Sequence, residues 1–288
     1  MNCPVCCAPM RPDFIVHGHD VFRCDSCQHR ASGPISSTDH VSAVYDDSYF
    51  QGGGAGYRDY PSEERILHAH GRRYGRLLRG HTRPGRVLDV GAAAGYVLQG
   101  LLDEGWTGVG LEPNRRMAEL ANRAGREVLV GTLEAPPEDL REKGPFDLVT
   151  MVQVVAHFHD LRRAFENAAA LTKPGGLWLI ETWDRSSWTA RLFGRNWHEY
   201  SPPSVLHWFD RAGLAGLVSQ FGMRTRAQGR PRKFISGGHA RSLLRYKLEA
   251  NALTRPLAWT TAVVPEHLPI PYPAEDLFWM LFQAAGKC

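Results

Sequence analysis

The 288-residue chain has no apolar run of the roughly 18 residues that a membrane-spanning helix needs. Its first residues, Met-Asn-Cys-Pro-Val-Cys, lack the apolar core of a signal peptide. The formal net charge is only +4, which is too small to indicate a polynucleotide partner by itself. These absences favour a cytoplasmic protein without a membrane segment, in a compartment where thiols stay reduced.

Internal repeats and low-complexity tracts are also absent from the sequence. Hydrophobic residues make up 43% of the chain and charged residues 22%, which is an ordinary globular composition with enough apolar material for a core. This length holds one large domain, or a medium-sized domain with a small appendage.

The chain has only six cysteines, and four of them form two C-x2-C pairs. Cys3 and Cys6 are separated from Cys24 and Cys27 by 17 residues, which is the spacing of a zinc ribbon. Two such turns direct four thiolates at one centre and leave no open position on the metal. We therefore expect a structural Zn²⁺ held by these four cysteines, which supplies most of the folding energy of so short a segment.

Composition divides the chain into four parts. Residues 1–36 are expected to form the zinc ribbon, and residues 37–82 a linker followed by an N-terminal helix. The linker contains the Gly-rich stretch 51–56 between aromatic residues, which is either a surface loop or a lid over a ligand. Residues 83–182 are expected to form the ligand-binding core, and residues 183–288 the elements that shape the second substrate's pocket.

Strand and helix patterns alternate through the central part. This alternation predicts an α/β fold with a doubly wound, mostly parallel sheet. Strands are expected at residues 86–90, 107–111, 127–130, 146–151 and 176–181. Helices are expected at residues 62–80, 95–104, 114–124, 137–142 and 160–171.

In such a sheet, ligands bind where the strands end at their carboxyl side. The first strand ends in the small-residue turn Gly91–Gly95, in which glycine allows a sharp bend or the close approach of a ligand. The second strand ends at Glu112, 17 residues beyond Gly95. A carboxylate there is suited to accept two hydrogen bonds from the vicinal hydroxyls of a ribose.

Four segments together resemble the class I S-adenosylmethionine-dependent methyltransferases: residues 87–95, 108–113, 146–151 and 171–181. The resemblance implies a seven-stranded, Rossmann-like sheet with S-adenosylmethionine bound over the strand ends. It also implies that Glu134 borders the adenine. The residues that it implies for cofactor binding are Asp89, Gly91, Ala92, Gly95, Glu112, Thr132, Leu133 and Gln153.

Residue 93 departs from the family pattern, which commonly has glycine at this position. Ala93 carries a methyl group, and an alanine is tolerated there without strain only if its φ stays negative. The φ of Ala93 therefore decides whether the turn can keep the family's geometry without strain.

The acceptor side is expected to be an aromatic pocket built by the last third of the chain. Methyl transfer requires that the acceptor be aligned and that its proton be removed. Histidine is the natural base at neutral pH. The candidates are His157, which directly follows the fourth strand, His198 and His207, with Tyr200 and Glu199 close by in sequence.

Several functions stay open from the sequence. The favoured one is methyl transfer to O, N or C of a small-molecule metabolite. A zinc ribbon before this fold is also found in ribosomal RNA guanine methyltransferases, but the ribbon here is not strongly basic, which disfavours nucleic acid. Sugar C-methyltransferases can also join a four-cysteine module to this fold. A nicotinamide dehydrogenase and a non-catalytic scaffold are the weaker alternatives, and the oligomeric state stays open.

Overall fold

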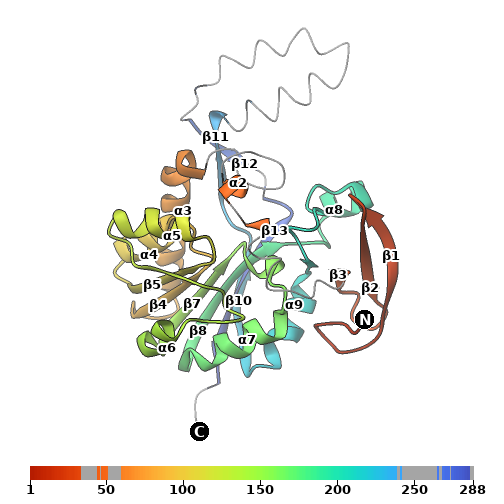
Figure 1. Ribbon diagram of the computed structural model, residues 1–288, viewed down its shortest axis with the longest axis horizontal. Helices are drawn as coiled ribbons and strands as arrows, with labels where there is room; N and C mark the ends of the chain where they lie inside the picture. The colour runs from red at the N-terminus through yellow and green to blue at the C-terminus, as the bar shows by residue number, and fades with distance from the viewer. Residues whose placement is uncertain are drawn as a thin grey trace.

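The computed structural model describes residues 1–33, 44–45, 47–50, 60–238, 241, 265, 268–272 and 274–285. Its main element is a seven-stranded sheet with helices on both faces, and a smaller four-stranded sheet stands beside it at the N-terminal end of the chain (Figure 1). A third sheet consists of two antiparallel strands, β11 (Lys233–Ser236) and β12 (Pro269–Tyr272).

The seven-stranded sheet has the order β10-β13-β8-β7-β4-β5-β6. Strand β13 runs antiparallel to both of its neighbours, whereas the remaining strands run parallel to one another. The expected mostly parallel sheet of seven strands is therefore confirmed. The strands are β4 (Arg86–Val90), β5 (Thr107–Glu112), β6 (Val128–Val130), β7 (Phe146–Val152), β8 (Thr172–Trp183), β10 (Met223–Gly229) and β13 (Leu277–Ala284).

Successive residues of β4 face opposite sides of this sheet, as the pleat requires. Val87 packs in the cluster that contains side chains of α3, α4 and α5, and Leu88 packs in the cluster that contains side chains of α6, α7 and α9. Both residues are fully buried, so the continuous apolar run of this strand reflects helices on both faces. The helices are α3 (Glu64–Leu78), α4 (Tyr96–Asp103), α5 (Arg115–Arg123), α6 (Glu138–Lys143), α7 (Leu161–Ala170) and α9 (Arg211–Ser219).

Helices α3 and α4 approach each other closely at two glycines. A Cβ atom at Gly71 would lie 2.1 Å from the carbonyl oxygen of Val97, and one at Gly100 would lie 2.3 Å from that of His68. This close crossing places the inner face of α3, including His70, beside the ends of the central strands.

The arginines on α3 do not form a purely solvated face. Arg72, Arg76 and Arg79 all pair with the buried carboxylate of Glu104, with N–O distances of 3.5, 3.0 and 2.8 Å. Their guanidinium groups are half exposed, so they neutralise the buried carboxylate and tie α3 to the end of α4 while still contacting water.

The four-stranded sheet joins the N-terminal segment to a much later part of the chain. Its strands β1 (Met10–Val16), β2 (His19–Cys24) and β3 (Arg30–Ser32) are antiparallel neighbours, and β3 pairs with β9 (His207–Trp208). The apolar residues Cys3, Val5, Met10, Cys24 and Ala31 belong to the same hydrophobic cluster as Leu88 and Val149 of the main sheet. The N-terminal segment thus shares its core with the larger sheet.

Short elements complete the described structure. They are α2 (Asp47–Phe50), η1 (Tyr60–Glu63), η2 (Val155–His157), α8 (Trp188–Phe193) and η3 (Gly194–Asn196). The Gly-rich stretch 51–56 lies outside the described residues. Across the part of the chain that is described, every helix is too short or too polar to cross a membrane.

Candidate functional site

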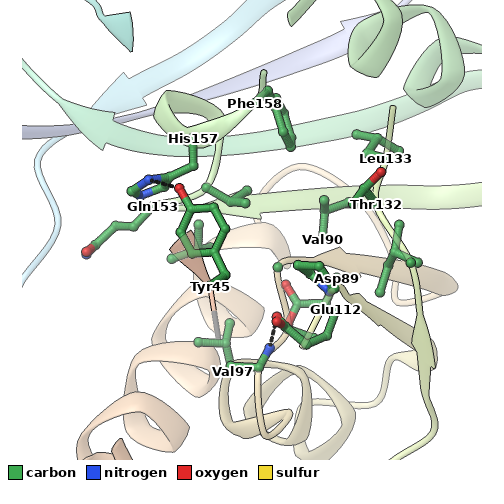
Figure 2. Close-up of a pocket in the computed structure, with 18 of the residues that line it drawn as sticks. Tyr45, Asp89, Val90, Val97, Glu112, Thr132, Leu133, Gln153, His157 and Phe158 are labelled. Atoms are coloured by element: carbon green, nitrogen blue, oxygen red, sulfur yellow. Dashed lines mark hydrogen bonds between the residues drawn. The ribbon is translucent and has the colours of Figure 1, made fainter. Parts of the chain in front are cut away.

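A cavity opens over the carboxyl ends of β4, β5 and β7 (Figure 2). Its lining includes every residue implied for cofactor binding except Gly95. Figure 2 shows Asp89, Glu112, Thr132 and Leu133 at one end, which we call the cofactor end. Tyr45, Gln153 and His157 lie at the other, which we call the acceptor end and to which we add His70 of α3. The order of strands along the sheet therefore separates the two ends.

The turn after β4 has a left-handed backbone at three residues. Gly91, Ala93 and Gly95 have φ angles of 69°, 46° and 74°. Ala93 thus does not meet the condition for an unstrained methyl group at this position, and a left-handed alanine costs about 1–2 kcal/mol relative to a right-handed one. The Ala93 N–H donates a 2.9 Å hydrogen bond to Oε2 of Glu112, which helps hold the turn in this conformation.

Glu112 is buried at the end of β5 and accepts hydrogen bonds from two backbone amides. One comes from Ala93 and the other, 2.9 Å long, comes from Asn114 to Oε1. Each carboxylate oxygen keeps a further lone pair, so the group can still accept from a diol. Burial raises the pKa of Glu112 to about 7, and the two amide donors oppose that rise.

Asp89, the next carboxylate of the cofactor end, is buried in the cavity wall. Thr150 Oγ1 donates to its Oδ1 at 2.6 Å, whereas its Oδ2 has no partner among the described residues. Burial raises the pKa of Asp89 to about 7. An unpartnered buried carboxylate oxygen is costly, and it fits a ligand that brings a donor or a positive charge.

The loop after β6 covers the cofactor end. Leu133 is buried, and Thr132 accepts a 3.2 Å hydrogen bond from the amide of Ala135. Glu134 lines the cavity too, but it accepts from the backbone N–H of His159 at 3.0 Å and pairs with that residue's ring. The loop therefore offers the cavity the apolar side chain of Leu133, whereas the Glu134 carboxylate is already bonded to His159.

His157 stands at the acceptor end, at the close of η2. Its Nδ1 lies 2.9 Å from the hydroxyl of Tyr45 (Figure 2) and 2.8 Å from the carbonyl oxygen of Ser204. The Tyr45 hydroxyl donates to the same carbonyl at 2.8 Å. A carbonyl only accepts, so Nδ1 carries the proton and Nε2 is the basic nitrogen. Burial lowers the pKa of His157, and the Ser204 carbonyl opposes that shift.

A second polar network lies behind the acceptor end. Glu181 is fully buried and accepts from Tyr74 Oη, from His70 Nε2 at 2.9 Å and from Gln153 Nε2 at 2.7 Å. Burial alone would raise the pKa of Glu181, but the attraction of His70 and the donated hydrogen bonds lower it to about 2. The carboxylate is therefore ionised, and by accepting from Nε2 it fixes the orientation of the Gln153 side-chain amide.

Gln153 has a left-handed backbone, with φ 55°. Its N–H donates to the carbonyl oxygen of Glu181 at 2.8 Å, so both its backbone and its side chain are fixed by that residue. Strained residues that are held this firmly are concentrated at functional sites.

The other acceptor-side candidates lie elsewhere. His198 is exposed and pairs with Glu199 at 2.9 Å, and Tyr200 is buried with its hydroxyl accepting from Arg30 at 2.8 Å. Neither lines the cavity. His207 is buried behind the cavity wall, where its Nε2 donates to the carbonyl of Phe158 at 2.9 Å. Of the candidates, the structure brings His157 alone to the cavity.

Tyr45, His70 and Glu181 were missed as site residues in the sequence. A usable signal existed for two of them. His70 and Tyr74 are one helical turn apart on the buried face of α3, where polar groups need partners. Glu181 follows a buried apolar run near the carboxyl end of β8, as Glu112 does at the end of β5, and this placement of a carboxylate is the shared signal.

The four cysteines of the C-x2-C pairs form a compact cluster. Their sulfur atoms all lie within 4.8 Å of one another. The Cys3–Cys27 and Cys6–Cys24 sulfur pairs are 3.5 and 3.4 Å apart. A tetrahedral zinc with Zn–S bonds of about 2.3 Å places its sulfurs about 3.8 Å apart, so the cluster has the dimensions of such a site.

Comparison with known proteins identifies a family. The model described as "Methyltransferase domain" matches residues 63–228. Curated relatives named ubiquinone biosynthesis O-methyltransferase include one from Bordetella avium, 27% identical over 161 residues, covering 51% of this chain and 65% of that protein. Another, from Agrobacterium fabrum, is 30% identical over 129 residues, covering 44% of this chain and 50% of that protein. The chain thus spans less than two thirds of these relatives.

Solved structures share the fold. A Burkholderia thailandensis 1,6-didemethyltoxoflavin-N1-methyltransferase, solved with its substrate and S-adenosylhomocysteine, matches with a TM-score of 0.53 and 17% identity, covering 96% of this chain and 99% of that chain. A Synechocystis magnesium protoporphyrin IX methyltransferase with bound S-adenosylhomocysteine matches with a TM-score of 0.54 and 9% identity, covering 86% and 100%. The fold is that of Rossmann-like methyltransferases.

Proposed function

The chain belongs to the methyltransferase-domain family, and from that premise we propose that it transfers a methyl group from S-adenosylmethionine to a small-molecule acceptor. The observation that carries the proposal is the position of Glu112, a buried carboxylate that faces the cavity opposite a left-handed small-residue turn. When bound, S-adenosylmethionine supplies a methyl group on a positively charged sulfur.

The described residues of the cofactor end fit such a ligand. Glu112 has lone pairs left for the two ribose hydroxyls, and the turn Gly91–Gly95 keeps side-chain bulk away from the ligand. Asp89 offers an unpartnered oxygen to a donor or a positive charge. Thr132 and Leu133 supply the wall that borders the adenine.

At the acceptor end, His157 is the base in our proposal. Its Nδ1 proton is held by the Ser204 carbonyl, which leaves Nε2 to take a proton from the acceptor. The buried ring is neutral near pH 7 because burial lowers its pKa. Gln153, oriented by Glu181, offers its amide oxygen to a hydroxyl or amine of the acceptor.

A small-molecule acceptor is supported by the character of the cavity and by the relatives. Tyr45, Phe50, Tyr60 and Phe158 give the described part of the cavity an enclosed aromatic wall. The curated relatives are named ubiquinone biosynthesis O-methyltransferases. One structural neighbour is named a 1,6-didemethyltoxoflavin-N1-methyltransferase. These names support acceptors of this size, and the acceptor atom stays open.

We also propose that the four-cysteine cluster holds a structural Zn²⁺. The support is the closeness of the four sulfurs, which come from two C-x2-C turns, one before β1 and one at the end of β2. Burial raises the pKa of Cys3 to about 11, so a cation is needed to keep this thiol as a thiolate ligand.

The proposed activity is tested by incubating the protein with S-adenosylmethionine labelled on the methyl group. The acceptors offered are a panel of phenols, amines and sugars, and bulk RNA in a separate tube. We expect label to enter a small-molecule product. Label that enters RNA, together with RNA binding that weakens steeply as salt is raised, contradicts the small-molecule acceptor.

A further inference from the structure

The described contacts connect the four-cysteine module to the residue at the acceptor end that is proposed as the base. The connection runs through one strip of chain, residues 204–208, which lies between the module and η2. On one side the strip contacts the residues flanking His157, and on the other it completes the module's sheet.

Three hydrogen bonds fix the strip to the cavity wall. The Leu206 N–H donates to the Ala156 carbonyl at 2.8 Å. The Ser204 carbonyl accepts from His157 Nδ1 at 2.8 Å. His207 Nε2 donates to the Phe158 carbonyl at 2.9 Å. These bonds reach residues 156, 157 and 158 in turn, so the strip determines where the His157 ring lies.

The opposite side of the strip is held by the module. The Ser32 N–H donates to the Leu206 carbonyl at 2.8 Å, and β3 pairs with β9 at Ala31 and His207. The rings of His29 and His207 are stacked, and His29 Nε2 lies 3.4 Å from His207 Nδ1. Because the Phe158 carbonyl only accepts, His207 carries its proton on Nε2, and its Nδ1 accepts from His29.

The sequence position of His29 makes this contact sensitive to the cysteines. His29 is two residues beyond Cys27, and its carbonyl accepts a 2.9 Å hydrogen bond from the N–H of Cys24. Two of the four cysteines therefore position β3 directly. Apart from the clusters that it shares with the rest of the chain, the module has little core, so the order of its two cysteine turns depends on what holds the cysteines together.

We propose that the four-cysteine module is the support that holds His157 in place, and that His207 is the positioning residue between them. The proposal rests on the proposed function, because it assigns His157 the role of base. A metal in the module then affects the reaction through His157. Loss of the metal loosens β3, and the strip 204–208 that pairs with β3 loosens with it. The cofactor end should keep its order, because the hydrogen bonds that hold β4, β5 and the turn after β4 are made within the main sheet.

Hydrogen exchange measured by mass spectrometry tests this proposal on the full chain, with one equivalent of Zn²⁺ and after a chelator has removed it. On removal we expect exchange to rise at least about tenfold in peptides covering residues 204–208 and 155–158, while peptides of β4 and β5 keep their protection. Titration with S-adenosylhomocysteine on the same samples should give the same affinity with and without zinc.

Two variants and a control separate the role of His207 from general loosening. His207→Leu should loosen residues 155–158 in the zinc-loaded protein, and His207→Gln should restore them because it keeps a donor for the Phe158 carbonyl. Gln220→Ala is the matched control, since Gln220 Nε2 donates to the Val5 carbonyl at 2.6 Å and so contacts the module away from the strip. It should leave residues 155–158 protected.

The outcomes are decisive in both directions. The proposal is overturned if residues 155–158 keep their protection while the module exchanges freely, or if chelation leaves the module itself protected. Failure to bind S-adenosylhomocysteine under any condition contradicts the proposed function instead, and the exchange data still report on the coupling.

Discussion

The two ends of the cavity are built differently. The cofactor end comes from residues 89–134, which form consecutive strand–turn–helix units, and its central carboxylate, Glu112, is held by two backbone amides of the same units. The acceptor end is assembled from segments as distant as Tyr45, His70, Glu181 and Ser204. The first is therefore set by local geometry, and the second depends on the packing of the whole chain.

The acceptor end is tested most strongly by replacing His157. For His157→Gln we expect kcat to fall by about 10²–10⁴, because a positioned base contributes on this order. The affinity for S-adenosylhomocysteine should be unchanged, since the residue lies away from Glu112. The exposed His81→Gln is the control and should behave like the unmodified protein. A parallel loss of cofactor affinity would show that the two ends are not separable.

The cofactor end is tested by Glu112→Ala. Two hydrogen bonds from ribose hydroxyls to a carboxylate are lost, so we expect the affinity for S-adenosylmethionine to fall about 100-fold in calorimetry. Glu119→Ala, an exposed carboxylate on α5, is the matched control. Unchanged affinity in the Glu112 variant contradicts the role assigned to this residue.

A smaller effect is expected from pH. The pKa values of Glu112 and Asp89 are raised to about 7, so both groups are largely protonated at pH 6 and ionised at pH 8. The ionised forms accept the hydroxyls and attract the positively charged sulfur, so cofactor affinity should be about tenfold weaker at pH 6 than at pH 8. Asp89→Asn should reduce this dependence. An affinity that is flat over the range contradicts it.

The same raised pKa values bear on stability. A carboxyl group whose pKa is higher in the folded state stabilises the fold below its unfolded pKa near 4, and this contribution is lost as pH rises through 7. The protein without cofactor should therefore lose stability between pH 6 and pH 8, and cofactor should reverse the loss. Thermal unfolding at both pH values measures this.

The smallest effect concerns the strained turn. Ala93→Gly relieves a left-handed alanine, and we expect it to stabilise the protein by about 0.5–1 kcal/mol after the entropy of the unfolded glycine is subtracted. Ala94→Gly is the control with the opposite sign, because Ala94 has no positive φ and is fully buried. Denaturant unfolding of the two variants measures the difference.

The contrast between the two ends also explains which parts of the site can be predicted from the sequence. Strand ends are visible as apolar runs followed by polar residues, so the position of Glu112 follows from pattern, whereas Gln153 is given by the family resemblance. The φ of Ala93 does not follow from the local pattern, because a hydrogen bond from its backbone amide to Glu112, 19 residues away, helps keep the turn left-handed. His198 and Tyr200 are close to β8 in sequence, but η3 and the aromatic packing around Trp208 direct them away from the cavity.

The partners of His157 were beyond the sequence for the same reason. Tyr45 is 112 residues away, and Ser204 is 47 residues away. The pairing of β3 with β9 likewise joins positions that no local pattern connects. Sequence patterns locate strand ends, whereas tertiary packing decides which distant side chains meet there.

Cofactor binding itself can be measured by calorimetric titration of the folded protein with S-adenosylmethionine. We expect one cofactor to bind per chain, competed by S-adenosylhomocysteine and weakened by Glu112→Ala. A protein that keeps its fold by circular dichroism and shows no heat of binding at pH 8 would contradict it.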